Sequence, residues 1–280
     1  MFRIPKAKAS DFKGRFREII ADPLNYVIKR HPNAGLTEGD NVVLHNGLKV
    51  PISGDFSYYD SFSDILIFNR GVHEPLEELV FQTLLRKLSN QRVSMLELGA
   101  YWGHYSMWLL LYRPDSKVVL IEPDSKNLDA GKYNFKENNF KGTFIKSFVG
   151  KDHFEVDEYF KTHNVDRLTI LHSDIQGYEV EMLEGASRTL NHKKVDYLFV
   201  STHSEDLHRA VEEQLQSFGY IIEVTSSFDR HTTSFDGFIF ARNPSKNSIF
   251  EGFEFLGREQ VLTLSPLEKI EYINQLRQFA

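Results

Sequence analysis

Three polar residues, His172, Ser173 and Asp174, end an apolar run that begins at Leu168 and has the composition of a buried strand. Glu179 follows Asp174 by five residues, where an amphipathic pattern starts. Carboxylates and an imidazole gathered at a strand end can move a proton, bind a polar acceptor or hold a divalent cation. This segment is therefore our first candidate for a catalytic site.

A second candidate is the turn in "ELGAYWGHYS", which holds Gly99 and Gly103 between an expected strand and a helix. Ligands of open α/β sheets bind at the carboxyl ends of the strands, so this turn indicates a nucleotide-like ligand. Glu97 precedes Gly99 by two residues and disfavours a pyrophosphate at the helix, and the third glycine of a dinucleotide fingerprint is missing. A ligand with an ammonium and a sulfonium suits this acid better.

Glu122 ends the next strand, in "LIEPD". An acidic residue about 20 positions beyond the glycines can accept hydrogen bonds from both hydroxyls of a ribose. Together, Glu97 and Glu122 describe S-adenosylmethionine better than NAD. The alternative is that both are surface carboxylates at strand ends, without a ligand.

The elements that must position these residues form a regular alternation from Val93 onward, which predicts a mostly parallel sheet with helices on both faces. The expected strands span 93–99, 117–123, 142–149, 168–174, 196–203, 220–227 and 237–243. The expected helices span 104–112, 127–138, 179–190 and 204–218. The link before the last strand is too short for a crossover helix, so we expect that strand to pair antiparallel to its neighbour.

The flanking regions predict an arm, hairpin and cap over residues 1–72 and a helical tail over 244–280, around a main domain at 73–243. Asn46-Gly47 between two β-rich runs favours a hairpin with a type I′ turn. Tyr58, Tyr59 and Phe62 are aromatics that either wall a pocket or pack a strand. A helix is expected over 74–89, and Ser265-Pro266 with Glu268 predicts a capped helix start. The first region is also a candidate oligomer contact.

Composition narrows the class of protein. The 280 residues are 41% hydrophobic with a formal charge of −6, so we expect a globular protein and no nucleic-acid substrate. The chain has no cysteine, which removes thiolate chemistry and leaves the redox compartment open. The basic amino-terminal arm lacks an apolar signal core, and no apolar run reaches the ~20 residues of a membrane span. Cytoplasmic localisation is the default expectation.

The stretches "LELGAYWGHYS", "LIEPD" and "HSDIQGYEVEMLEGA", followed by a strand that ends in His203, resemble the FkbM family of S-adenosylmethionine-dependent methyltransferases. The resemblance covers roughly Glu74 to Arg242. It implies a Rossmann-like class I methyltransferase fold with seven strands, the last reversed, and O-methylation of a hydroxyl. The acceptor implied is a sugar, a glycoconjugate or another small molecule.

The resemblance also implies roles for individual residues. Glu97, Gly99 and Gly103 would bind the methionine part of the cofactor, Glu122 the ribose, and the region of Asp174 would face the acceptor. The expected cofactor site is completed by Ala100, Tyr101, Tyr105, Ser106, Pro123, Ser147 and Asp174.

Methyl transfer to a hydroxyl needs alignment and a group that removes the proton. His203, at the end of its strand, is the expected general base, because a neutral imidazole suits this work near neutral pH. Asp174 can orient that imidazole, bind the acceptor, or join Glu179 and His203 around a divalent metal. The expected catalytic set is therefore His203, Asp174 and Glu179, with the metal left open.

Five further residues lie near these motifs. His172 is expected to be a packed, hydrogen-bonded histidine, and His104 lies near the cofactor loop or points to solvent. Tyr101 and Trp102 either close over a ligand or pack under the sheet. Tyr178 is expected to narrow the acceptor pocket.

Two other functions remain open on sequence grounds. An NAD-dependent oxidoreductase is disfavoured by Glu97 and by the missing glycine. A non-catalytic binding module that keeps the cofactor cleft is the other alternative, because a fold does not guarantee chemistry.

Overall fold

The computed structural model describes residues 12–58, 63–88, 92–228 and 236–279 of the chain. They form two compact units. One comprises the described residues up to Thr83 and those from Leu256 on, and the other comprises residues 84–228 and 236–255. Tyr59 and Phe62 of the expected aromatic pocket wall lie outside the described residues.

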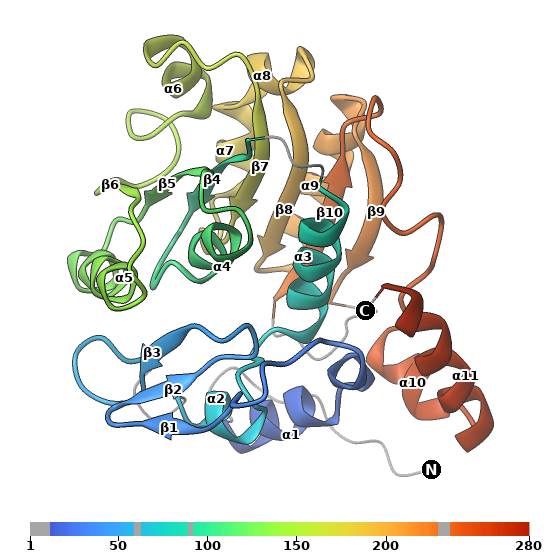
Figure 1. Cartoon of the computed structure of the whole chain (residues 1–280). Coiled ribbons are helices and arrows are strands. Elements are labelled where there is room, and N and C mark those ends of the chain that lie inside the picture. Colours follow the sequence, from blue (N-terminus) through green and yellow to red (C-terminus); the bar gives the residue numbers. More distant parts are fainter. Residues whose placement is uncertain (1–11, 59–62, 89–91, 229–235, 280) are drawn as a thin grey trace. The chain divides into compact units, whose positions relative to one another are not determined.

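The second unit is built on a seven-stranded sheet (Figure 1). Its order is β6-β5-β4-β7-β8-β10-β9, and β10 pairs antiparallel with both neighbours while β6, β5, β4, β7 and β8 run parallel. The strands are β4 (Ser94–Leu98), β5 (Lys117–Ile121), β6 (Thr143–Ile145), β7 (Leu168–Ser173), β8 (Val195–Thr202), β9 (Ile221–Ser226) and β10 (Gly237–Arg242). All seven expected strands and the reversal of the last one are confirmed.

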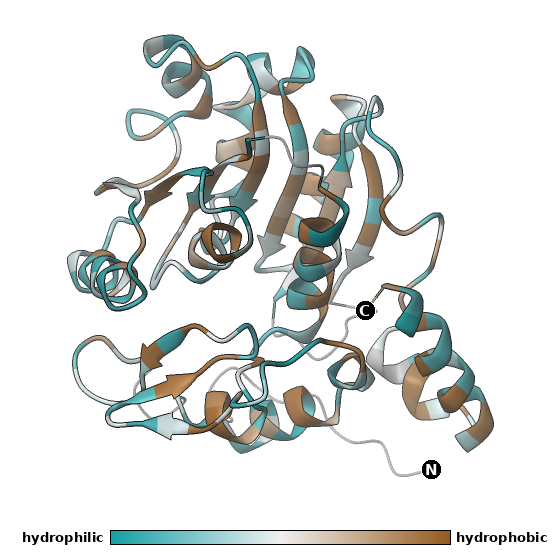
Figure 2. Cartoon of the chain, in the orientation of Figure 1, coloured by the Kyte–Doolittle hydropathy of each residue, from teal (hydrophilic) through white to brown (hydrophobic). Residues whose placement is uncertain are grey.

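Helices cover both faces of this sheet. They are α4 (His104–Tyr112), α5 (Ser125–Glu137), α6 (Val156–Thr162), α7 (Glu179–Glu184), α8 (Ser187–Asn191) and α9 (Glu205–Ser217). On one face, buried side chains of α6, α7, α8 and α9 join inward-facing residues of the strands in one apolar cluster. On the other face α4 and α5 cover the sheet, where Phe135 of α5 lies over Leu120 of β5. Figure 2 shows hydrophobic residues along the strands and in α4 of this unit.

The expected helix over 179–190 is wrong as a single element, because the chain turns at Gly185 and starts again as α8. Asp157 of α6 explains the new start. Its carboxylate accepts hydrogen bonds from the backbone N–H groups of Arg188 (2.9 Å) and Thr189 (2.8 Å), which are otherwise unpaired in a first helical turn. Burial raises the pKa of Asp157, but these hydrogen bonds outweigh it and hold that pKa below its usual value. α6 itself was not among the expected helices.

The first unit contains a small antiparallel sheet, β1-β2-β3, and helices from both ends of the chain. Its elements are α1 (Phe12–Ala21), η1 (Pro23–Tyr26), β1 (Thr37–Glu38), β2 (Asn41–Val43), β3 (Lys49–Pro51), α2 (Asp64–Phe68), α10 (Arg258–Thr263), α11 (Pro266–Leu276) and η3 (Arg277–Phe279). The helix α3 (Pro75–Lys87) runs from this unit into the next. The tail is fixed to α3, since the Thr83 hydroxyl donates to the carbonyl oxygen of Phe279 at 3.0 Å.

A hairpin turn and a helix start in this unit test the sequence predictions. The hairpin between β2 and β3 is confirmed, but its turn is not type I′. Gly47 has a positive φ of 93° whereas Asn46 does not, and the Gly47 N–H donates to the Leu44 carbonyl at 2.9 Å, as in a type I turn followed by a left-handed glycine. The capped start of α11 is confirmed: Ser265 and Glu268 exchange side-chain to backbone hydrogen bonds.

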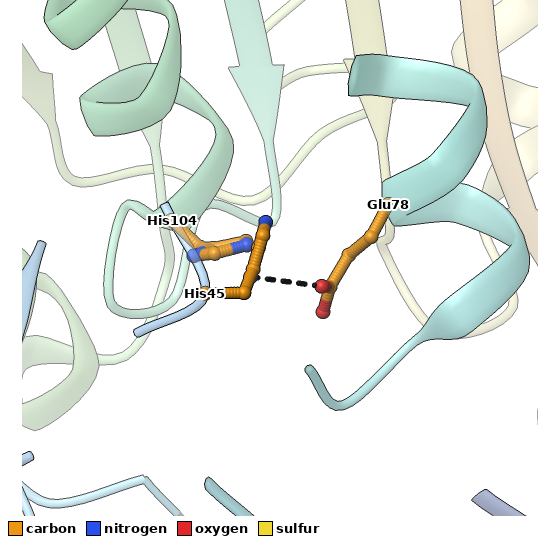
Figure 3. Close-up of side chains that lie close together, drawn as sticks. All are labelled: His45, Glu78 and His104. Atoms are coloured by element: carbon orange, nitrogen blue, oxygen red, sulfur yellow. Dashed lines mark ion pairs between the residues drawn. The ribbon is translucent and has the colours of Figure 1, made fainter. Parts of the chain in front are cut away.

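A buried polar cluster in the first unit centres on Glu78 of α3. The Glu78 carboxylate lies 3.1 Å from His45 Nδ1 and 2.7 Å from His73 Nδ1 (the His45 pair is drawn in Figure 3). Burial lowers the pKa of His45 despite this partner. At His73 burial also lowers the pKa, but Glu78 and Glu74 outweigh it and raise that pKa. The cluster therefore gives the buried Glu78 carboxylate two imidazole partners whose pKa values shift in opposite directions.

In the described ranges, no helix has the length and apolarity that a bilayer crossing requires.

Candidate active site

The carboxyl ends of β4, β5 and β7 are tied together at Gly99. The backbone N–H groups of Gly99 and Ala100 donate to the Ile121 carbonyl at 2.9 and 3.0 Å, and the Asp174 N–H donates to the Leu98 carbonyl at 2.9 Å. Gly99 has φ +72°, and a Cβ there would lie 1.8 Å from the Asp174 carbonyl oxygen. Only glycine permits this approach, which sets the loop from Gly99 to Gly103 beside Asp174.

Glu97 caps the helix that follows the loop. Its side chain is buried and accepts hydrogen bonds from the backbone N–H groups of Tyr105 (3.3 Å) and Ser106 (3.0 Å) in the first turn of α4. Burial raises the pKa of Glu97, and His172 and these N–H groups offset part of that rise. A carboxylate thus occupies N–H donors in the first turn of α4 that a pyrophosphate would need.

Glu122 supports the loop from the next strand. One carboxylate oxygen accepts from the Tyr101 N–H at 3.0 Å, and the other accepts from the Asp124 N–H at 2.9 Å. Burial raises the pKa of Glu122, and the two N–H groups counteract this. Tyr101 needs that support, because its φ of +44° is strained for a residue with a side chain. Pro123 and Ser147 lie half-buried at the same edge of the sheet.

His203 follows β8 and lies between the two carboxylates of the opening motif. Its Nδ1 is 2.8 Å from Glu179 Oε1, and its Nε2 is 3.2 Å from Asp174 Oδ1. Glu179 is fully buried, whereas the Asp174 side chain is 34% exposed. Asp236, at the start of β10, is 3.7 Å from Nε2. The structure therefore brings together the three expected catalytic residues and adds a third carboxylate.

The charge of His203 differs from the expectation. Burial lowers the pKa of His203, but hydrogen bonds with Asp174 and Glu179 outweigh it, and that pKa rises from 6.5 to about 10. His203 is therefore an imidazolium at neutral pH in this arrangement, and an imidazolium has no lone pair with which to accept a proton. This argues against the neutral general base inferred from sequence.

The geometry also does not support the expected metal. Asp174 and Glu179 contact opposite nitrogens of the His203 ring, so within the described part of the chain the three residues do not offer one ligand atom each to a common point. A shared proton on each ring nitrogen explains the same distances.

The remaining candidates near the loop are mostly packed. His172 is buried against Tyr105 with ring centroids 4.2 Å apart, as expected of a packed histidine. His104 is buried and stacks on Trp102 at 5.1 Å, so it does not point to solvent. Tyr178 directly precedes α7 and is 56% exposed.

Sequence reasoning missed two residues at this site. Asp236 reaches His203 only because β10 pairs antiparallel with β8, with Gly237 opposite Thr202. His208 of α9 is fully buried behind this pair, with Nδ1 2.7 Å from the Thr202 hydroxyl and Nε2 2.9 Å from the Thr225 hydroxyl. No local sequence pattern identifies either residue as part of the site, since both reach it only through strand pairing.

The family model described as "Methyltransferase FkbM domain" matches residues 74–222, which is more than half of the chain. The chain belongs to the FkbM methyltransferase family. Membership supports S-adenosylmethionine-dependent methyl transfer as the chemistry of this domain. No curated protein sequence matches the FkbM chain significantly.

Solved methyltransferase structures resemble the FkbM chain distantly. A precorrin-6y C5,15-methyltransferase from Geobacter metallireducens is 16% identical, with a TM-score of 0.43 over 60% of this chain and 89% of that one. An O-methyltransferase from Bacillus cereus in complex with S-adenosylhomocysteine is 14% identical, with a TM-score of 0.40 over 59% and 80%. Aeropyrum pernix fibrillarin, with natively bound S-adenosylmethionine, is 14% identical, with a TM-score of 0.42 over 57% and 72%.

The raised pKa of His203 predicts a pH-dependent stability difference between the FkbM chain and its His203→Gln variant. A folded-state pKa raised above the unfolded value stabilises fully below the unfolded pKa, here 6.5, and that contribution is lost as the pH rises through about 10. Urea unfolding followed by tryptophan fluorescence at pH 6, 8 and 10 should show a stability advantage of the parent chain that is largest at pH 6 and smallest at pH 10. The exposed His192→Gln variant is the control. An advantage of equal size at all three pH values would show that His203 is not held as an imidazolium.

Proposed function

We propose that this chain transfers the methyl group of S-adenosylmethionine to a hydroxyl of a sugar, a glycoconjugate or a related small molecule. The observation that carries the proposal is the Asp174–His203–Glu179 cluster, which lies at the same sheet edge as the Gly99 loop. Proton-accepting groups beside a cofactor loop suit an acceptor that loses a proton on methylation.

The residues of the loop fit the cofactor by their chemistry. Glu122 would hold the ribose hydroxyls, and the turn from Gly99 to Tyr101 would bind the methionine part. Glu97 keeps the start of α4 closed to phosphate, because its carboxylate accepts hydrogen bonds from N–H groups in the first turn of that helix. The cofactor supplies an activated methyl group on a sulfonium. The protein's share is to align the acceptor oxygen and to take its proton.

Asp174 is the group that we assign to the proton. Asp174 and Asp236 are the two partly exposed carboxylates near His203, at 34% and 32%, and Asp174 is the nearer to Nε2, at 3.2 Å against 3.7 Å, so an acceptor hydroxyl can reach a carboxylate that the imidazole holds. Glu179 is fully buried, accepts hydrogen bonds from the Gly177 N–H at 3.1 and 3.2 Å, and anchors the imidazole. His203 then holds Asp174 in place and stabilises its charge. This assignment moves the base from His203 to its carboxylate partner.

The test of catalysis is a methyl-transfer assay of Asp174→Asn against a panel of sugars, nucleotide sugars and glycolipids. Loss of a general base slows such a step by ~10²- to 10⁴-fold, and we expect this loss in kcat with S-adenosylhomocysteine affinity unchanged. The exposed Asp129→Asn of α5 is the matched control. Full turnover by Asp174→Asn on an acceptor that the parent methylates would remove Asp174 from the chemistry.

Cofactor choice is tested separately by calorimetry with S-adenosylhomocysteine and with NAD. We expect heat from the first only. Binding of NAD alone would favour an oxidoreductase, and the absence of both would favour a binding module.

A further inference from the structure

A cavity of about 670 Å³ opens at the amino ends of β4, β5, β6 and β7, the edge of the sheet opposite to the candidate active site. Its floor is apolar and includes Met95, Val118 and Val165. Neither the cofactor loop nor the His203 cluster contributes to its lining. The proposed function therefore leaves this cavity without a role.

The charged side chains that line the cavity are all basic: Lys117, Lys141 and Arg167, with His163 beside them. None of its lining residues is a carboxylate. The chain as a whole has an excess of acidic residues, 39 against 33 basic ones, so this lining departs from the average surface. A concave site with one sign of charge attracts ligands of the opposite sign.

Lys117 is the first residue of β5, and Lys141 lies two residues before β6, the parallel neighbour of β5. Both line the cavity. Among the described residues, neither ammonium has an ion pair or hydrogen bond, so this like-charge pair lacks an internal counterion. Two like charges on the wall of one cavity repel each other, and a bound anion would offset that repulsion.

Arg167 is only partly neutralised. It pairs with Asp196, but the same carboxylate also contacts Lys246 Nζ at 3.0 Å. One carboxylate is thus shared between two cations. Asp196 therefore neutralises only part of the positive charge of Arg167 and Lys246.

An aromatic wall completes the cavity. Tyr159 and His163, one turn apart near the end of α6, stack with ring centroids 4.4 Å apart and planes inclined by 25°. Both line the cavity. Flat rings over an apolar floor favour a ligand with an apolar or aromatic body, which a simple inorganic anion lacks.

We propose that this cavity binds an organic anion of nucleotide size, with its phosphate or carboxylate at Lys117, Lys141 and Arg167 and its flat part against Tyr159. The volume lies within the range of about 300–1,000 Å³ that is usual for small-molecule sites. β4 and β5, which contribute to the floor of the cavity, end at the candidate active site. A ligand bound at their amino ends is therefore placed to modulate the candidate active site at their carboxyl ends.

The test is calorimetric titration of the whole chain with uridine 5′-monophosphate, uridine and inorganic phosphate, with and without saturating S-adenosylhomocysteine. We expect the nucleotide to bind with a Kd below ~1 mM and both fragments to bind at least ~10-fold more weakly. The Lys117→Gln/Lys141→Gln double variant should weaken nucleotide binding at least ~10-fold, because it removes the charge of both ammonium groups. Lys126→Gln/Lys136→Gln, on exposed positions of α5, is the matched control and should bind as the parent does.

Four outcomes would overturn the proposal. The first two are no nucleotide binding up to ~10 mM and unchanged nucleotide binding by Lys117→Gln/Lys141→Gln. The other two are binding of uridine alone, or of phosphate alone, that is as tight as binding of the nucleotide. Labelling with pyridoxal 5′-phosphate and borohydride gives a second readout. Lys117 and Lys141 should react faster than Lys126 and should be protected by the nucleotide, and equal, unprotected labelling would also overturn the proposal. Because each readout is independent of methyl transfer, failure here leaves the proposed function standing, and the reverse holds.

Discussion

Gly99→Ala is expected to prevent stable folding of the sheet unit. The new Cβ would lie 1.8 Å from the Asp174 carbonyl oxygen and 2.7 Å from the carbon of that carbonyl. Both are backbone atoms of β7's carboxyl end, which cannot swing aside as a side chain would. The residue would also be held at φ +72°, where an L-residue with a side chain is strained by about 1–2 kcal/mol. We expect the free energy of unfolding to fall by more than about 4 kcal/mol in total, which is exceptional for one substitution.

Gly252→Ala is the matched control for this prediction. Gly252 has a similar φ of +79° in the same unit, but a Cβ there would meet nothing within 4 Å. Gly252→Ala should therefore lower the free energy of unfolding only by the backbone strain of about 1–2 kcal/mol. Urea unfolding of both variants, with circular dichroism and tryptophan fluorescence, separates the clash from the strain. Equal losses in the two variants would mean that the strand ends are not packed as tightly as described.

Glu122→Ala is expected to weaken S-adenosylhomocysteine binding by about 100-fold. Hydrogen bonds to a charged group contribute about 1.5–3 kcal/mol each, and the variant loses both the proposed ribose contacts and the acceptor for the Tyr101 N–H. Burial raises the pKa of Glu122. Affinity should therefore fall at acidic pH as the carboxylate takes up a proton. Calorimetry at pH 5, 6 and 7.5 measures both effects.

Asp124→Ala provides the comparison for Glu122. Asp124 belongs to the same turn, but its carboxylate caps α5 through the N–H groups of Lys126 (2.8 Å) and Asn127 (3.0 Å). Its loss should cost stability of about 1 kcal/mol and leave cofactor affinity unchanged. Glu122→Gln retains one acceptor oxygen and should fall between the parent and Glu122→Ala. Equal affinity in the parent and Glu122→Ala would exclude Glu122 from cofactor binding.

The sheet was predictable from sequence because the strands are short, mostly apolar runs between turn or helical segments and because the link before β10 is too short for a crossover. The positions of Glu97, Glu122, Asp174 and His203 at one edge follow from parallel pairing alone. Helix boundaries that depend on a distant cap were not predictable: α8 begins where Asp157, about 30 residues earlier, supplies the acceptors. Periodicity contains no information on such a partner.

The charge state of His203 was the other feature that the sequence could not predict. A histidine after a strand suggests a base, but its protonation depends on which groups face each nitrogen. Asp174 and Glu179 were known candidates, yet only their contacts with opposite ring nitrogens show that His203 holds its proton. Asp236 enters through β10 pairing and was invisible before the fold was known.

Every residue of β8 is buried, and the strand has a neighbour on each side. Amide protons in such a strand exchange with solvent only when the whole unit opens, whereas the edge strands β6 and β9 can fray on their own. His203 is the residue that directly follows β8. The imidazole is thus attached to the most slowly exchanging segment expected in the unit, so fraying of the edge strands does not displace the backbone that carries it.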